Sequence, residues 1–122
     1  MKNLICIIAA DPNSINSEII AKVWKKKAEF KNLNIFIIGN YILIKKQLAK
    51  IKVNLNLKKI SKIQKQNFKK KLLIYDVPLK FNRLFNISAK AKSDYVINSF
   101  KIAIKLMKKE KMLGLINCPI NK

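Results

Sequence analysis

Histidine is absent from the 122-residue sequence, so the commonest general base and metal ligand is missing from this chain. The six carboxylates are scattered, and no two of them have a spacing that indicates an acid–base pair or part of a nucleophile triad. Glycine occurs only at Gly39 and Gly114, which excludes a glycine-rich dinucleotide or phosphate loop after the first predicted strand. The residues alone therefore indicate no particular reaction.

Long apolar runs are also missing. Half of the residues are hydrophobic, but lysines interrupt them, and no run approaches the roughly 20 residues that span a bilayer. We expect no membrane segment and a cytoplasmic protein. The opening run, residues 4–9, is interpreted as a buried strand and not as a secretory signal, because it is short and leads into a helix start. Cys6 and Cys118 lie in apolar segments without metal-ligand spacing, so both are expected to be buried and reduced.

Negative charge is scarce: 27 basic residues face 6 acidic ones, a formal net charge of +21. Clustered basic residues can bind the phosphates of nucleic acid. Proteins that recognise specific nucleic-acid sequences, however, rely on arginine and on stacking aromatics, and Arg83 is the only arginine here. The lysines are more simply explained as a solvated surface, whose composition reflects codon drift in an AT-rich genome. Nucleic acid is not the expected partner. A small basic module that binds nucleic acid or another anion through residues 58–71 remains the alternative function.

Apolar segments alternate with helical patterns along the chain. Strands are predicted at residues 4–9, 34–39, 72–77 and 111–118, and helices from Asn16 or Ser17 to about residue 27, from the cap Asn40 to about residue 50, and over 88–109. Residues 51–57 alternate in polarity, which predicts a strand near an edge. Residues 58–71 are interpreted as a mobile, Lys-rich surface loop. The order predicts a single α/β domain over residues 1–122, an open, mostly parallel layered sheet with helices on both faces.

Ligands of open α/β sheets bind beyond the carboxyl ends of the strands. Two polar turns follow predicted strands there, residues 11–18 after the first strand and residues 117–122 after the last. An Asp before Pro is commonly a turn former, and a terminal lysine is commonly solvated, so a structural role for either stays open. The candidate substrate-cleft residues are Asp11, Asn13, Asn117, Asn121 and Lys122.

Several segments resemble the amino-terminal region of the 4-hydroxythreonine-4-phosphate dehydrogenase (PdxA) family. Residues 5–20 are similar to the family's opening strand and its Gly-Asp-Pro-Ala-Gly-Ile-Gly-Pro-Glu turn, residues 34–40 to its second strand, and residues 86–93 with the long helix to its corresponding helix. Residues 114–122 resemble the strand that ends in Thr-Ala-Pro-Ile-Asn-Lys. The closing Pro-Ile-Asn-Lys is the most specific match. The sequence departs from the family where Ala10, Ser14 and Asn16 replace glycines of the turn and Ser17 replaces its proline.

The resemblance implies an isocitrate/isopropylmalate-dehydrogenase-like fold. It also implies oxidation and decarboxylation of 4-phosphooxy-L-threonine in pyridoxal 5'-phosphate biosynthesis, with NAD or NADP, a divalent metal and a homodimer. The family's histidine metal ligands, its Gly-His-Thr substrate motif and its nicotinamide site all follow the Pro-Ile-Asn-Lys segment. We therefore expect a truncated fold that lacks the metal and nicotinamide sites and is inactive alone. The expected partner is a phosphorylated small-molecule substrate.

Overall fold

Strands and helices alternate along the chain in the computed structural model, which describes residues 3–14 and 16–118. The strands are β1 (Leu4–Ile8), β2 (Asn34–Gly39), β3 (Leu57–Ile60), β4 (Leu72–Asp76) and β5 (Met112–Asn117). The helices are α1 (Asn16–Lys25), α2 (Tyr41–Lys50) and α3 (Ala89–Lys109), with a short 3-10 helix, η1 (Lys27–Phe30), after α1. No helix in these described residues is long and apolar enough to cross a membrane.

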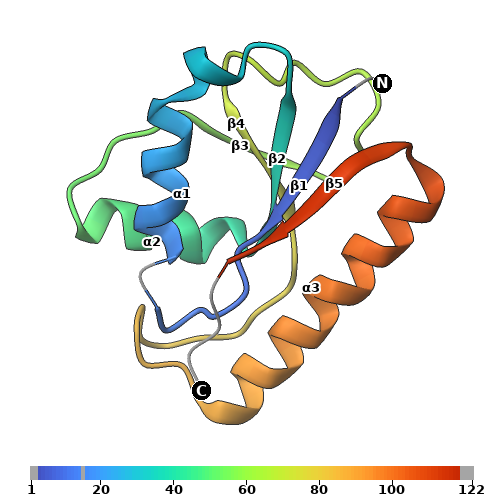
Figure 1. Cartoon of the computed structure of the whole chain (residues 1–122). Helices are drawn as coiled ribbons and strands as arrows, with labels where there is room; N and C mark the ends of the chain where they lie inside the picture. The colour runs from blue at the N-terminus through green and yellow to red at the C-terminus, as the bar shows by residue number, and fades with distance from the viewer. Residues whose placement is uncertain (1–2, 15, 119–122) are drawn as a thin grey trace.

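The five strands form one open sheet in the order β3-β4-β2-β1-β5, and every strand pair is parallel. Helices α1 and α2 cover one face, and α3 covers the other (Figure 1). Ile8 near the end of β1 lies opposite Ile38 of β2 and Asn117 of β5, so these three strands end at the same side of the molecule. The predicted layered α/β fold with helices on both faces is confirmed.

Two apolar layers hold the sheet between its helices. Successive side chains of a strand point to opposite faces, so Cys6 and Ile8 pack towards α3, whereas Ile7 packs towards α1 and α2. The same division separates Phe36 from Ile37 in β2. The central strands are therefore apolar on both sides, which is why they form continuous hydrophobic runs in the sequence.

The start of α2 follows its predicted cap, Asn40, and α3 also begins after a capping side chain, Ser88. The Leu43 amide donates to Asn40 Oδ1 at 2.9 Å at the start of α2, and the Ala91 amide donates to Ser88 Oγ at 3.3 Å at the start of α3. Each cap satisfies an amide that has no partner within the first helical turn. The first helix is shorter than expected, since it ends at Lys25 and the chain continues into η1.

The strand predicted over residues 51–57 is wrong in position. The Lys52 amide donates to Ala49 O at 3.1 Å, and the Val53 amide donates to Leu48 O at 2.9 Å. These bonds, with Lys52 at φ 60°, form the Schellman motif that ends α2. The apolar alternation that begins at Ile51 therefore belongs to a helix end. The strand starts only at Leu57, and it does lie at an edge of the sheet.

Residues 58–71 were expected to contain no regular element, but residues 58–60 complete β3. Residues 61–71 contain turns and neither helix nor strand. Two of their apolar side chains, Ile63 and Phe68, are only 1% and 5% exposed and pack into the core beneath α3. The segment therefore presents lysines to solvent while these side chains attach it to the core.

Candidate functional site

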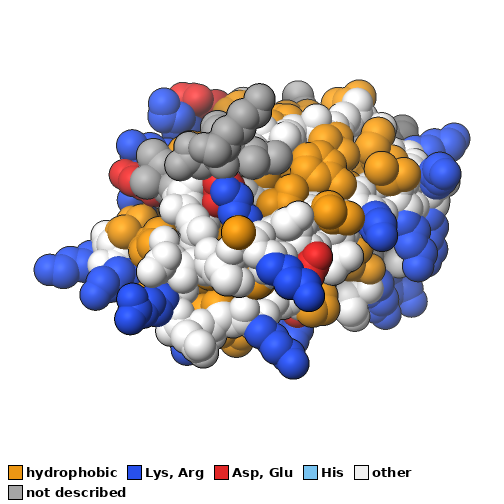
Figure 2. Space-filling model, turned by 90° about the horizontal axis from the view of Figure 1, so that it is seen from below, with side chains coloured by type: hydrophobic (Ala, Val, Ile, Leu, Met, Phe, Trp, Pro, Cys, Tyr) orange, Lys and Arg blue, Asp and Glu red, His pale blue; other side chains and the backbone are white. Residues whose placement is uncertain are grey.

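The ends of β1 and β5, from which the two predicted polar turns begin, lie next to each other at the carboxyl end of the sheet. The Cys118 amide donates to Ile8 O at 3.0 Å, so the chain leaves β5 beside the point where it leaves β1. This end is at the bottom of Figure 1, and Figure 2 looks directly onto it. Asn117 is exposed there. Asn121 and Lys122 lie outside the described residues.

Asp11 is buried in the first turn and carries a defined set of partners. Its Oδ1 accepts from the Asn13 amide at 2.9 Å, and its Oδ2 lies 3.0 Å from Lys92 Nζ in the first turn of α3. The Asp11 side chain is fully buried, whereas that of Lys92 is 25% exposed. This ion pair connects the first turn to α3. The sequence did not single out Lys92, because it is one lysine among many.

Asn13 holds the loop between β4 and α3 against the first turn. Its Nδ2 donates to Ile87 O at 2.9 Å, and its Oδ1 accepts from the Ile87 amide at 2.6 Å. One side chain thus pairs with both backbone groups of a residue 74 positions away. Asn13 therefore positions the loop at the candidate site, and its contact with a substrate stays a prediction.

The buried side chain of Gln47 in α2 hydrogen-bonds to the same turn. Its Nε2 donates to Pro12 O at 2.8 Å and to Leu84 O at 2.6 Å, while its Oε1 accepts from Ser17 Oγ at 2.6 Å. Gln47 is only 2% exposed. In a low-dielectric interior these bonds are costly to break, so the network fixes the first turn relative to α1 and α2.

Tyr95 of α3 contributes a further buried polar group near the end of β2. Its hydroxyl oxygen accepts from the Asn40 amide at 2.8 Å, and Asn40 Nδ2 donates to Val77 O at 2.8 Å. Burial, reinforced by the negative charge of Asp76, raises the pKa of Tyr95 well above its ordinary value. The hydroxyl therefore remains protonated, and it serves the packing of α3 against β2.

The first turn begins with a backbone conformation that glycine favours. Ala10 has φ 58°, in the left-handed region that is unfavourable for residues with a Cβ. The resemblance had placed a glycine at this position. The turn therefore keeps this backbone conformation although alanine stands where the family has glycine. The Ala10 side chain is completely buried and packs into the core between the sheet and α3.

A polar depression of about 290 Å³ lies in the loop between β4 and α3, beside the first turn. Its lining includes the cations of Lys80 and Arg83 and the amide side chains of Asn82 and Asn86, and no carboxylate is among its lining residues. Such a set matches the oxygen atoms of a phosphate monoester. No sequence motif indicates this depression, and the only local signal is the chain's single arginine, Arg83.

The described residues do not fit a divalent metal or a nicotinamide cofactor. Among residues 3–14 and 16–118, no three His, Cys, Asp or Glu side chains are grouped as metal ligands would be. The first turn has no glycine with which to approach a pyrophosphate closely. The polar side chains of the first turn, Asp11 and Asn13, instead contact α3 and the loop that precedes it.

No protein-family model matches the sequence, and no curated protein matches it. Solved structures do match its fold. A 4-hydroxythreonine-4-phosphate dehydrogenase from Burkholderia phymatum is similar over 98% of this chain, with a TM-score of 0.86 and 16% identity. The same enzyme from Klebsiella pneumoniae matches over 99%, with a TM-score of 0.81 and 20% identity. A protein proposed to be this enzyme from Salmonella typhimurium matches over 100%, with a TM-score of 0.81 and 23% identity.

The chain spans only 37 to 38% of the length of these solved structures. The fold of this chain therefore corresponds to one part of the fold of these longer proteins.

Proposed function

We propose that this chain forms the amino-terminal part of an NAD(P)-dependent dehydrogenase that oxidises a phosphorylated hydroxy-amino acid, 4-phosphooxy-L-threonine, and that it is inactive alone. The observation that carries the proposal is the fold match over at least 98% of the chain to two such dehydrogenases. In the proposed enzyme, the chain supplies one wall of the substrate cleft. The metal ligands and the nicotinamide site belong to the remaining part of the fold.

The polar end of the sheet supports this proposal. The first turn and the end of β5 are adjacent, and the loop that Asn13 holds carries Lys80 and Arg83. In the proposed enzyme these two cations bind the substrate phosphate through charge-assisted hydrogen bonds. Asp11 and Asn13 keep the loop in place, so their effect on substrate binding is exerted through its position.

The test uses a fusion in which this chain replaces the matching amino-terminal region of the Klebsiella pneumoniae enzyme. Production of reduced nicotinamide from 4-phosphooxy-L-threonine is followed by absorbance, for the fusion and for the isolated chain. We expect turnover by the fusion and none by the isolated chain. Turnover by the isolated chain contradicts the proposed division of the site, and a folded fusion without activity contradicts the proposed substrate.

Arg83→Gln in the fusion tests the phosphate contact. Loss of one charge-assisted hydrogen bond of about 1.5–3 kcal/mol should raise KM by about tenfold or more, with a smaller effect on kcat. Lys105→Gln, an exposed change on α3 with the same loss of charge, is the matched control and should leave KM unchanged. Equal KM values for the two variants would place the phosphate elsewhere.

A further inference from the structure

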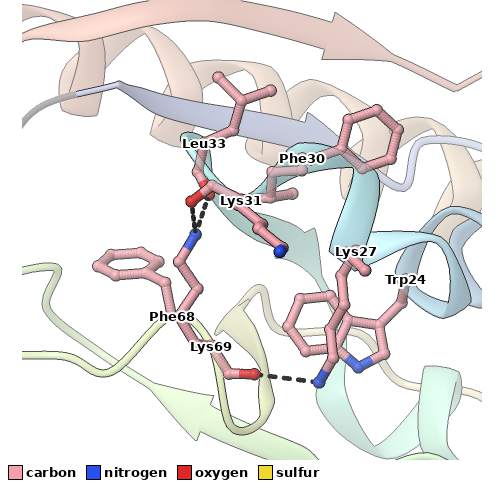
Figure 3. A pocket seen from close by; sticks show the side chains of 9 residues that line it. Trp24, Lys27, Phe30, Lys31, Leu33, Phe68 and Lys69 are labelled. Carbon is pink, nitrogen blue, oxygen red and sulfur yellow. Dashed lines mark hydrogen bonds between the residues drawn. The ribbon is translucent and has the colours of Figure 1, made fainter.

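A second concave site lies at the amino-terminal end of the sheet, opposite the ends of β1 and β5. It has a volume of about 370 Å³, and its walls come from the end of α1, from η1 and from the segments that precede β2 and β4 (Figure 3). Its apolar walls include Trp24, Phe30, Leu33 and Phe68. This volume is within the range of small-molecule sites, which are mostly apolar with a few placed polar groups.

Three lysines surround this apolar space. The ammonium group of Lys27 lies 4.6 Å from the centre of the Trp24 ring and donates to Lys69 O at 3.0 Å. The ammonium group of Lys69 donates to Lys31 O and to Leu33 O, both at 2.7 Å. These contacts, drawn in Figure 3, hold two of the cations in fixed positions at the pocket.

Lys31 supplies the third positive charge, and its ammonium group has no hydrogen-bond or ion-pair partner among the described residues. No acidic residue lines the pocket. An apolar cavity with three cations and no anion is complementary to a ligand that has the opposite charge and a hydrophobic body. A neutral ligand would leave this charge without a counterpart.

We propose that this pocket binds a small organic anion with a flat apolar body, such as an aromatic carboxylate or sulfonate. The body lies against the apolar walls formed by Trp24 and Phe30, and the anionic group meets the ammonium group of Lys31 with Lys27 nearby. The proposal concerns a different end of the sheet from the proposed dehydrogenase site and does not rest on it.

Trp24 is the only tryptophan of the chain, so its indole resonance reports on this pocket alone. The full chain, labelled with nitrogen-15, is titrated with naphthalene monosulfonate while the indole N–H peak is followed by NMR. We expect a saturable shift with a dissociation constant of about 1 mM or below, as for a small ligand with modest binding energy per atom. The neutral analogue naphthalenemethanol should bind at least about fivefold more weakly, because it lacks the charge.

Two variants locate the binding. Lys31→Gln should weaken sulfonate binding by about fivefold, because it removes a partly screened charge, and leave binding of the neutral analogue unchanged. Ala28→Phe, which places a ring in the pocket, should abolish the saturable shift. Lys105→Gln on α3 carries the same charge change and should have no effect. The proposal is overturned if the indole peak does not shift saturably, if both probes bind equally, or if Lys31→Gln and Lys105→Gln behave alike.

Discussion

Lys52 occupies a backbone conformation that suits glycine better than lysine. It follows the last turn of α2 with φ 60°, and its side chain is exposed. A residue with a Cβ is disfavoured there, whereas glycine is the usual residue at this position of a Schellman motif. The backbone at Lys52 is therefore slightly strained, and a substitution can relieve that strain.

Lys52→Gly should raise the free energy of unfolding by about 0.5–1 kcal/mol, because the relief of strain exceeds the extra entropy of the unfolded chain. Lys50→Gly removes the same charge from the last residue of α2 and should lower the free energy of unfolding by about 1 kcal/mol. Urea denaturation measures both. Destabilisation by both variants would contradict the left-handed conformation at Lys52.

Gly39 and Gly114 have opposite surroundings, although both lie in strands. A Cβ at Gly39 would come within 2.9 Å of Ile44 Cδ1 and 3.0 Å of both Ala9 Cβ and the Tyr95 hydroxyl. A Cβ at Gly114 would meet nothing within 4 Å. The first glycine is thus required by close packing, and the second is not.

Gly39→Ala should lower the free energy of unfolding by about 1–3 kcal/mol, because the added methyl group forces neighbours apart in a filled core. It should also disturb the hydrogen bond between Tyr95 and Asn40. Gly114→Ala is the matched control and should be neutral or stabilising by up to about 1 kcal/mol. Thermal or urea unfolding distinguishes them, and similar losses for both variants would contradict the packing around Gly39.

The two edge strands of the sheet differ in character. The edge strand β3 carries the exposed residues Lys58 and Lys59, and charged side chains protect a sheet edge from pairing with another chain. The opposite edge strand, β5, exposes Leu113 and Ile116 by 64% and 52%. An apolar groove of about 320 Å³ continues from Ile116 across Ile5 and Ile7 to α1. The β5 edge is therefore apolar and carries none of the charged residues that protect the β3 edge.

Ile116→Lys should reduce concentration-dependent association of the isolated chain, because a charge at the β5 edge opposes strand pairing and burial of the groove. Ile104→Lys is the matched control: Ile104 is also 52% exposed, but it lies on α3 and not on a strand of the sheet. Sedimentation velocity over a range of concentrations measures the effect. Equal effects of the two variants would show that general charge, and not the edge, governs association.

The positive charge of the molecule is spread over its surface and is not confined to one patch. Figure 2 shows lysine and arginine side chains spread around the carboxyl-end face, with hydrophobic and uncharged atoms between them. Residues 58–71 add further lysines, but the two large apolar anchors of residues 61–71, Ile63 and Phe68, are buried. Phe68 is the only aromatic residue of this segment and its ring is buried, so the segment lacks the exposed stacking rings that single-stranded nucleic-acid sites use.

We therefore expect only weak, sequence-independent nucleic-acid binding. Anisotropy of a labelled single-stranded RNA should give a dissociation constant weaker than about 1 µM at physiological salt, with binding lost steeply as salt rises. A mutant with lysines 58, 59 and 62 changed to Gln should weaken low-salt binding uniformly across sequences. Tight, sequence-selective binding at physiological salt would favour the basic binding module over the dehydrogenase fragment.

Local patterns were sufficient to predict most elements of this molecule. Apolar runs marked the central strands, and the capping side chain of Asn40 marked the start of α2, because these signals arise from neighbours in sequence. The pattern failed at residues 51–57, where an apolar alternation belongs to a helix end whose hydrogen bonds are visible only in three dimensions. It also failed at residues 58–71, where burial of Ile63 and Phe68 depends on α3.

By itself, the sequence determined the alternation of strands and helices, the absence of histidine and the excess of positive charge. Only the tertiary structure decided that Asp11 pairs with Lys92, that Asn13 holds Ile87, and that three lysines line one pocket with Trp24. Local conformation follows from neighbouring residues, whereas these contacts join segments far apart in the chain. Their partners are set by the strand order and by the faces on which the helices pack, which no short stretch of sequence encodes.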